Sequence, residues 1–329
     1  MFSIRGASVK AFLGAWVCAA ALLTSGLAGA GEPLRIGYPV WVGYGPLFLA
    51  QEKKFFTQNG VEVQMIKMDD TKLRYAALAA GRLDGLASSF ASVALYTKPE
   101  LALVTVLPLD ESAGGDGVVA IREVKTVADL KGRTVAFELG SISEFYLNYL
   151  LQQAGLGPQE IRAVNMKPSD AAAAFIAGRV DAAVTWEPWL TKATQVPGGH
   201  LLHDSSKTPG LLVDALVFRK DVVQARRAEV QAVIRGWLQA VDYYKANNTE
   251  SVAIMAKKVG GWLEKPEDFA ETLNGVRYYD RGMIREYFAG PGAKAFATSQ
   301  FAIDLWARQG KVNGALKAVD VVDNSLIPQ

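Results

Sequence analysis

The sequence predicts an α/β protein with two similar lobes, and three observations support this fold class. Short β-branched and apolar runs alternate with alanine-rich helical patterns, as expected for parallel βαβ units. The same arrangement recurs further along the chain at a nearly constant offset. The chain of 329 residues is also longer than one hydrophobic core normally organises.

The first thirty residues have the composition of a secretory signal peptide. Arg5 and Lys10 precede the uncharged apolar run 11–23, and the small residues 28–30 predict cleavage before Gly31. An N-terminal membrane anchor is the alternative, but the apolar run is shorter than the roughly 20 residues that span a bilayer. We therefore expect residues 1–30 to be a signal peptide that directs the protein to the periplasm.

Charge and cysteine content argue against several classes of function. Arg5 and Lys10 account for the net charge of +2, because removing them from the 35 Lys and Arg residues leaves 33, equal to the 33 Asp and Glu residues. This balance gives no indication of a nucleic-acid partner. Cys18, the only cysteine, lies in the predicted signal, so the exported chain has no disulfide or thiolate site. We expect neither a metal nor a cofactor.

The first predicted βαβ units begin at Arg35. Strands are expected at 35–40, 61–65 and 83–87, and helical patterns fill the intervening segments, from Pro46 to Phe56 and from Lys72 to Ala80. Strand and helix alternate throughout, which favours a parallel sheet.

A second set of elements repeats this order. Strands are expected at 133–137 and 180–185, with helices at 143–153 and 171–177. The sequence Ala80-Gly81-Arg82-Leu83-Asp84 returns as Ala177-Gly178-Arg179-Val180-Asp181, at an offset of 97 residues. In both copies a glycine ends the helix and an aspartate lies in the turn into the strand. Two homologous α/β lobes are the simplest interpretation.

A ligand site is expected between the lobes, because open parallel sheets bind ligands beyond the carboxyl ends of their strands. The loops at these positions are rich in aromatic and hydroxyl side chains, the mixture that lines small-molecule pockets. The candidate ligand-binding residues are Trp41, Tyr44, Ser88, Ser89, Asp116, Glu138, Ser141, Ser143, Trp186 and Glu187. Asp214 and Trp189 are further candidates. Structural roles are the alternative, with the serines as helix caps and the 186–189 segment as a turn.

Several segments resemble one known family. The motifs are Ile36-Gly37-Tyr38, Pro46-Leu47-Phe48-Leu49-Ala50, Ala79-Ala80-Gly81-Arg82-Leu83-Asp84, Asp129-Leu130-Lys131-Gly132 and Thr185-Trp186-Glu187-Pro188-Trp189. Together they resemble the nitrate/sulfonate/taurine group of ABC-transporter substrate-binding proteins. The resemblance implies a monomeric, non-enzymatic protein with a type II-like periplasmic-binding fold. Such a protein holds a solute in a cleft and delivers it to an ABC permease.

The resemblance also implies two hinge crossings between the lobes. We expect them near 117–120 and 215–218. The first lobe would then comprise residues 31–117 and 218–329, and the second lobe residues 118–217. The C-terminal helical region from Val222 onward would pack mainly on the first lobe.

The charges in the predicted site loops favour a nitrogen-containing solute. These loops, with the segment 110–117, contain five carboxylates and no Lys or Arg; the carboxylates are Asp110, Glu111, Asp116, Glu138 and Glu187. A cationic amine or guanidinium would supply their missing partner, and the aromatic side chains could flank it. An anionic solute such as a sulfonate, taurine or nitrate is the alternative, because helix N-termini can hold oxyanions without basic side chains.

An enzyme on the same architecture is the main rival class. Thiamine-pyrimidine precursor synthases resemble this family, but they act inside the cell and need reactive His, Lys and Cys side chains. This chain has only His200 and His203, and no Ser-His-Asp spacing, metal-ligand cluster or phosphate loop. A binding protein that serves a membrane sensor is a further alternative that the residues do not distinguish from a transport role.

Overall fold

The computed structural model describes residues 2, 32–259, 263, 265–288 and 293–328. The predicted signal peptide lies almost entirely outside these residues. Within the described part of the chain, no helix is both long enough and apolar enough to cross a membrane.

Eleven strands form two separate sheets in the described residues. The strands are β1 (Leu34–Tyr38), β2 (Val63–Lys67), β3 (Gly85–Ser89), β4 (Leu103–Ser112), β5 (Asp116–Ile121), β6 (Thr134–Phe137), β7 (Arg162–Asn165), β8 (Ala182–Trp186), β9 (Gly199–Asp204), β10 (Val213–Arg219) and β11 (Val276–Tyr278). The six-stranded sheet has the order β11-β4-β10-β3-β1-β2, and the five-stranded sheet has the order β7-β6-β8-β5-β9. Each sheet has a parallel half next to an antiparallel half.

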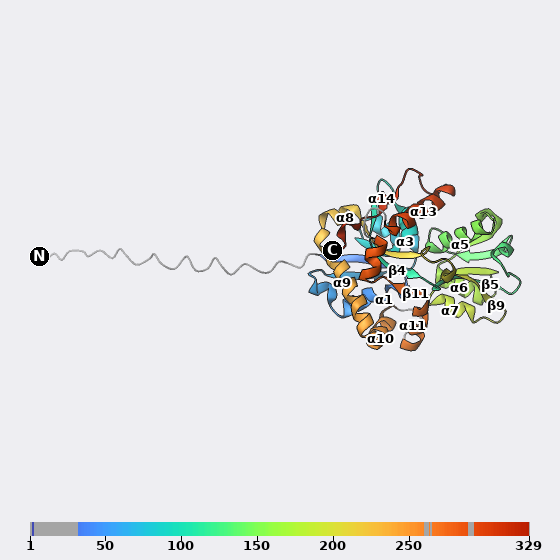
Figure 1. Ribbon diagram of the computed structural model, residues 1–329, viewed down its shortest axis with the longest axis horizontal. Helices are drawn as coiled ribbons and strands as arrows, with labels where there is room; N and C mark the ends of the chain where they lie inside the picture. The colour runs from blue at the N-terminus through green and yellow to red at the C-terminus, as the bar shows by residue number, and fades with distance from the viewer. Residues whose placement is uncertain (1, 3–31, 260–262, 264, 289–292, 329) are drawn as a thin grey trace.

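Helices cover the faces of both sheets (Figure 1). In the first part of the chain they are α1 (Gly45–Glu52), α2 (Phe55–Gln58), α3 (Thr71–Ala79), α4 (Phe90–Tyr96), α5 (Ile142–Gln153), α6 (Pro168–Ile176) and α7 (Trp189–Thr194). In the second part they are α8 (Lys220–Ala225), α9 (Arg227–Ala246), α10 (Asn248–Val259), α11 (Pro266–Thr272), α12 (Arg281–Phe288), α13 (Lys294–Arg308) and α14 (Ala318–Val321). The 3-10 helices η1 (Val42–Tyr44) and η5 (Leu273–Gly275) lie beside the site described below.

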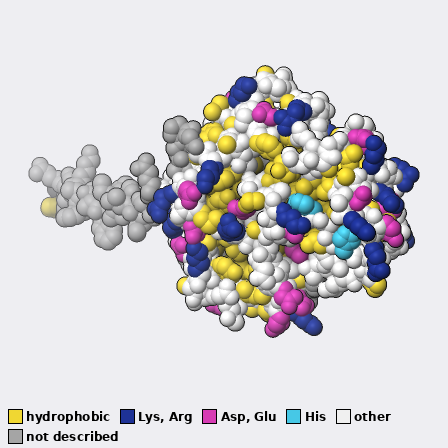
Figure 2. Space-filling view, turned by 45° about the vertical axis from the view of Figure 1, so that its right-hand side comes forward, with side chains coloured by type: hydrophobic (Ala, Val, Ile, Leu, Met, Phe, Trp, Pro, Cys, Tyr) yellow, Lys and Arg dark blue, Asp and Glu magenta, His cyan; other side chains and the backbone are white. Residues whose placement is uncertain are grey.

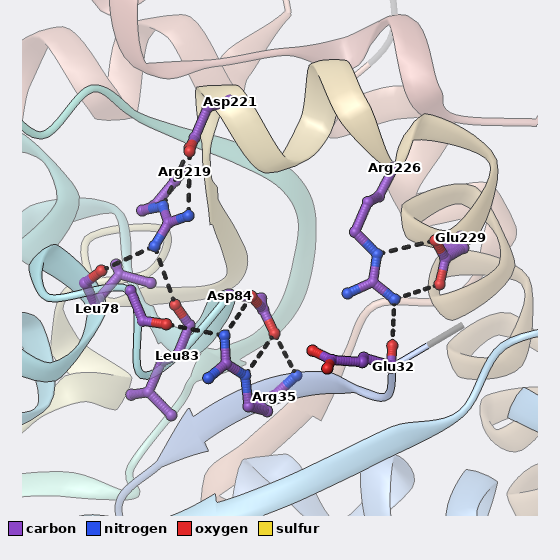
Figure 3. Close-up of polar contacts among 10 residues, drawn as sticks. Glu32, Arg35, Leu78, Leu83, Asp84, Arg219, Asp221, Arg226 and Glu229 are labelled. Carbon is purple, nitrogen blue, oxygen red and sulfur yellow. Dashed lines mark hydrogen bonds and ion pairs between the residues drawn. The ribbon is translucent and has the colours of Figure 1, made fainter. Parts of the chain in front are cut away.

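The sequence repeat corresponds to a structural repeat. In the first sheet the backbone N–H of Arg35 donates to the Asp84 carboxylate at 2.8 Å, and Figure 3 shows the same carboxylate facing the Arg35 guanidinium. In the second sheet the N–H of Thr134 donates to the Asp181 carboxylate at 2.7 Å. The glycines before the two aspartates, at 81 and 178, have φ values of +68° and +65°. The aspartate thus ties the start of two neighbouring parallel strands in both lobes.

The hinge crossings lie a few residues from the expected positions. Segments 117–120 and 215–218 are inside β5 and β10, whereas the chain passes between the sheets at 113–115 and 205–212. The reason is local sequence. The expected crossings are apolar runs that fill central strands, whereas Ala113-Gly114-Gly115 offers no large side chain to pack in a sheet. We therefore infer that residues 213–217 belong to the first lobe rather than to the second.

The two lobes are unequal in size. In Figure 1 the second lobe is the body that carries α5, α6, α7, β5 and β9, and the other body carries α1, α3 and β4 together with the C-terminal helices α9, α10 and α13. Helices α9 and α10 pack on α1, and α13 packs on α4, so the C-terminal region extends the first lobe. Acidic and basic side chains are interspersed over the face shown in Figure 2. The predicted α/β class with two sheets is confirmed.

Candidate functional site

A small cavity lies between the two sheets at the carboxyl ends of the parallel strands. The empty space between its lining atoms is about 370 Å³, part of which is open to solvent. Its lining residues are Pro39, Trp41, Tyr44, Thr71, Arg74, Ser88, Ser89, Ser92, Asp116, Ser141, Ile142, Trp186 and Asp214. Seven of the ten expected site residues are therefore brought together here: Trp41, Tyr44, Ser88, Ser89, Asp116, Ser141 and Trp186.

The aromatic walls of the cavity are fixed by their polar atoms. Trp41 Nε1 donates to Asp110 Oδ1 at 3.0 Å, and Trp186 Nε1 of the second lobe donates to the Val40 carbonyl of the first lobe at 2.8 Å. The Tyr44 hydroxyl forms a side-chain hydrogen bond with Asp214. All three rings are almost fully buried, so they present flat faces in a set orientation.

The serine hydroxyl groups lie where helices begin at the cavity. Ser89 Oγ accepts from the Ser92 N–H as the N-cap of α4, and Ser141 Oγ accepts from the Ser143 N–H as the N-cap of α5. Ser88 Oγ pairs with the Tyr75 hydroxyl at 2.9 Å. The cavity is therefore lined by hydroxyl groups from both lobes.

Arg74 is the one basic side chain of the lining, and sequence reasoning missed it. It lies one turn into α3 and is only 3% exposed. Its Nη atoms donate to the Met68 carbonyl and to Thr71 Oγ1, but Nε has no hydrogen-bond partner. Across the described residues, the Arg74 guanidinium forms no ion pair. The carboxylates of Glu138 and Asp214 lie near enough for the Arg74 charge to lower their pKa values against the rise that burial causes, and Arg74 Nε remains open to a further acceptor.

Three aspartates lie close to the hinge: Asp116 and the partly exposed Asp214 line the cavity, whereas Asp110 is buried outside its lining. Asp214 on β10 lies directly opposite Ser89 on β3 and Asp110 on β4 in the sheet register. Asp116 begins β5 of the second lobe, directly after the first crossing. Directly opposite side chains on neighbouring strands share one face of the sheet, and like charges in this position repel.

Burial raises the pKa values of these three carboxyl groups. Desolvation, with further repulsion from Asp116 and Glu111, raises the pKa of Asp110 to about 8, despite the hydrogen bond from Trp41. Desolvation also raises the pKa of Asp116 to about 7, and it raises the pKa of Asp214 well above its usual range. The ionised forms of these three carboxyl groups are therefore disfavoured unless a cation binds next to them.

Glu138, an expected site residue, does not line the cavity. Its carboxylate accepts hydrogen bonds from the backbone N–H of Thr71 at 2.7 Å and from Thr71 Oγ1 at 2.9 Å. Glu138 belongs to the second lobe and Thr71 begins α3 of the first lobe, so this pair joins the lobes across the cleft. The favourable position of an anion at a helix N-terminus explains the contact.

Ser143 and Glu187 are also outside the lining. Glu187 accepts from the Thr191 N–H at 3.2 Å and from Thr191 Oγ1 at 2.8 Å, so its carboxylate is used at the start of α7. Ser143 lies within the first turn of α5, where its buried Oγ has no hydrogen-bond partner. Trp189, a further candidate, is also absent from the lining and packs against the second lobe's core.

Two lining residues that the sequence analysis did not predict, Thr71 and Arg74, have the same kind of position in the fold. Thr71 and Arg74 lie one helical turn apart at the start of α3, immediately after the carboxyl end of β2. Residues in the first turn of such a helix face the ligand side of the sheet. The prediction considered the loops that follow β1, β3, β6 and β8, the segment 110–117 and Asp214, and it overlooked the loop after β2 and the start of α3.

The chain is similar in sequence to one protein family and to two named binding proteins. The model of the NMT1-like family matches residues 28–260. An Escherichia coli K12 protein named for binding aliphatic sulfonates is 30% identical over 237 residues, which are 70% of this chain and 72% of the relative. The taurine-binding periplasmic protein of the same organism is 25% identical over 239 residues, or 70% of each chain.

Among solved structures, the alkanesulfonate-binding protein SsuA from Xanthomonas axonopodis pv. citri bound to MOPS has a similar fold. The TM-score is 0.70 at 23% identity, and the match covers 90% of this chain and all of that one. This likeness confirms the predicted two-lobed periplasmic-binding fold. The predicted resemblance to the nitrate/sulfonate/taurine group is likewise confirmed, and the chain belongs to the NMT1-like family.

Proposed function

We propose that this chain is the solute-binding component of an ABC importer and that its solute carries a small oxyanion of the sulfonate type. In this proposal residues 1–30 are a cleavable signal peptide, and the protein works as a monomer in the periplasm. The names of its relatives support the transport role and favour a sulfonate-like ligand over the simple cation that the sequence suggested.

The buried guanidinium of Arg74 is the observation that carries the proposal. Its Nε–H has no hydrogen-bond partner, and Ser92 Oγ, which accepts from Ser89 Oγ, keeps its own O–H to donate in the same cavity. An oxyanion has several acceptor oxygens, and it would match this set of donors. The charge count made from the sequence covered only the predicted site loops, and Arg74 joins the cavity lining from α3 instead.

Binding would be coupled to closure of the lobes. Trp186 and Ser141 come from the second lobe, whereas Arg74, Tyr44 and Ser88 come from the first. A solute that contacts both lobes stabilises the closed state over the open one. The hydrogen bonds from Trp186 to Val40 and from Thr71 to Glu138 would form only when the lobes meet.

A nitrogen-containing cationic solute is the second candidate, and the aspartates at the base of the cavity favour it. Asp116 and Asp214 line the cavity, and neither carboxylate forms an ion pair within the described part of the chain. On this alternative the solute would be bound through an amine or guanidinium, and Arg74 would have only a structural role.

Calorimetric titration with a panel of alkanesulfonates, amino-sulfonates, nitrate, amines and guanidines tests the proposal. We expect at least one sulfonate to bind, and Arg74→Met to weaken that binding by about 30-fold or more, because the loss of one partner of a buried charge pair costs at least about 2 kcal/mol. Arg82→Met is the matched control, since Arg82 is exposed in the same lobe.

The proposal is contradicted if amines or guanidines bind while no oxyanion does. It is equally contradicted if Arg74→Met remains folded, by circular dichroism, and binds the sulfonate as tightly as the Arg82→Met control.

A further inference from the structure

We propose that Glu138 of the second lobe is a positioning residue for solute binding, which acts through Thr71 to orient the guanidinium of Arg74. The oxyanion donor of the first lobe is then held in place by the second lobe, and only while the lobes are closed. This inference rests on the proposed function, since it concerns how Arg74 is prepared for its acceptor. It gives a role in binding to a residue that does not itself line the cavity.

Three buried side chains form a chain of hydrogen bonds from one lobe to the other. The Thr71 hydroxyl donates to Glu138 Oε2 at 2.9 Å, and the same hydroxyl oxygen accepts from Arg74 Nη2 at 3.2 Å. The backbone N–H of Thr71 donates to Glu138 Oε1 at 2.7 Å. Thr71, Arg74 and Glu138 are 2%, 3% and 4% exposed, so water competes little for these bonds.

The single hydrogen of the Thr71 hydroxyl makes this arrangement directional. A hydroxyl group has one hydrogen to donate and two lone pairs that accept. When the hydrogen points to the Glu138 carboxylate, the lone pairs of Thr71 Oγ1 are left for Arg74. An ionised acceptor also polarises the hydroxyl and strengthens the next bond in the chain. Without Glu138 the hydroxyl is free to rotate, and its lone pairs no longer have a set direction.

The orientation of the guanidinium depends on two anchors. Arg74 Nη1 donates to the carbonyl of Met68, and Nη2 donates to Thr71 Oγ1. Met68 is itself fixed, since its N–H donates to the Tyr38 carbonyl at 2.8 Å. Because the guanidinium is planar, holding both Nη atoms sets the direction of the Nε–H, which has no hydrogen-bond partner among the described residues. Loss of the Thr71 anchor would leave the group held at one point.

The loop that carries Glu138 also carries a lining residue of the cavity. Ser141 Oγ donates to the Glu138 carbonyl at 2.7 Å, so the two residues are held in one unit. Between them Gly140 has a φ of +81°, and a Cβ on it would lie 2.7 Å from the Tyr96 hydroxyl of the first lobe. A solute that contacts Ser141 therefore also brings Glu138 to Thr71 as the lobes close.

Two simpler roles for Glu138 lead to different expectations. As a countercharge, its carboxylate would only offset the charge of Arg74, and its removal would strengthen the binding of an anion. As a latch, Glu138 would hold the lobes together without any effect on the order of the Arg74 side chain. The positioning role predicts both weaker anion binding and a less ordered Arg74 side chain when the link through Thr71 is removed.

Calorimetric titration of the full exported chain with the alkanesulfonates, amino-sulfonates and nitrate of the panel above tests the inference. Thr71→Val removes the hydroxyl but keeps the backbone N–H that reaches Glu138. We expect it to weaken oxyanion binding by about tenfold, as for the loss of a hydrogen bond to a charged group. Thr71→Ser should bind within about twofold of the parent protein, since a serine hydroxyl makes the same two hydrogen bonds.

Thr191→Val is the matched control. Thr191 makes the same kind of pair inside the second lobe, where its hydroxyl donates to Glu187 Oε1 at 2.8 Å and its N–H donates to Oε2 at 3.2 Å. Neither residue lines the cavity. We therefore expect Thr191→Val to bind oxyanions as the parent protein does. Circular dichroism and thermal unfolding show whether each variant is folded.

A double-mutant cycle tests whether Glu138 acts through Thr71. Glu138→Ala alone should weaken oxyanion binding by about tenfold or more, because it removes both bonds to Thr71. Combined with Thr71→Val, it should cost less than the product of the two separate losses. Losses that simply multiply would contradict the inference, and so would stronger oxyanion binding in Glu138→Ala.

The order of the Arg74 side chain is a readout that a latch alone would not change. In ¹⁵N spectra of the oxyanion-bound protein, the Arg74 Nε–H should exchange with water faster in Thr71→Val than in the parent protein or in Thr71→Ser. Arg74→Met assigns the signal. Arg35 is the internal reference, because its Nε donates to Asp84 away from the cavity (Figure 3), and its signal should stay constant. An unchanged Arg74 signal in Thr71→Val would overturn the inference.

Failure of the inference and failure of the proposed function give different results. If the parent protein binds an oxyanion and Thr71→Val binds it equally tightly, Glu138 does not prepare Arg74 through Thr71, but the oxyanion site stands. If no oxyanion of the panel binds to the parent protein, the proposed function is contradicted, and the inference fails with it.

Discussion

At the scale of single residues, the site depends most on Arg74, whose buried Nε–H has no hydrogen-bond partner. Arg74 shows why the sequence could not predict every site residue. It occurs in an alanine-rich helix with Lys72 and Arg82 nearby, and only the tertiary structure shows that Arg74 is buried while Arg82 is exposed. The aromatic and serine residues were predictable, because they follow strands in loops where a core role is less natural.

Gly115 is a second residue whose importance is visible only in the structure. A Cβ at this position would lie 2.6 Å from Trp41 Cη2 and 2.9 Å from the Gly275 carbonyl oxygen. Gly115 therefore lets the first hinge crossing pass against a cavity wall and against η5, whose Gly275 carbonyl accepts from the N–H groups of Ala113 and Gly115.

We expect Gly115→Ala to displace Trp41 and to weaken solute binding, with a loss of stability of about 1–3 kcal/mol from overpacking. Thermal unfolding and calorimetric titration measure the two effects. Gly314→Ala is the control, since no atom lies within 4 Å of its hypothetical Cβ and its φ is not positive. Unchanged Tm and affinity in Gly115→Ala would show that the hinge segment simply moves aside.

At the scale of helices and strands, most of the repeat was predictable from sequence. The glycine-then-aspartate pattern marks the same helix end and the same strand start in both lobes, and the structure places both aspartates on equivalent backbone N–H groups. The helix expected from Pro46 to Phe56 is instead two helices, because Lys54 adopts a left-handed conformation with φ of +60°. No sequence pattern marks this break, since Lys has no preference for that region.

The repeated aspartates should contribute unequally to stability. Asp181→Ala removes the acceptor for Thr134 N–H, which should cost about 1–3 kcal/mol as for a donor left unsatisfied. Asp84→Ala should cost more, because Asp84 also accepts from the Arg35 guanidinium at 2.9 and 3.0 Å. Urea unfolding of both variants gives the comparison. Equal losses would mean that the half-exposed Arg35–Asp84 ion pair contributes nothing measurable.

At the scale of the whole molecule, the lobes meet on two sides of the cavity. On one side Thr71 and Glu138 join α3 to the second lobe, and on the other side α13 of the first lobe packs against α5, where Asn148 donates to Gln309 at 2.9 Å. The two-lobed plan was predictable from the repeat. The contact between α13 and α5 was not, because it depends on how the C-terminal region packs against both lobes.

The central claim is that a small oxyanion-bearing solute is held between the lobes by Arg74. A crystal structure of the protein grown with 2-aminoethanesulfonate tests it most directly. We expect the solute in the cavity between the two sheets, with a sulfonate oxygen at about 2.9 Å from Arg74 Nε. A solute bound with its sulfonate away from Arg74, or bound outside this cavity, would contradict the claim.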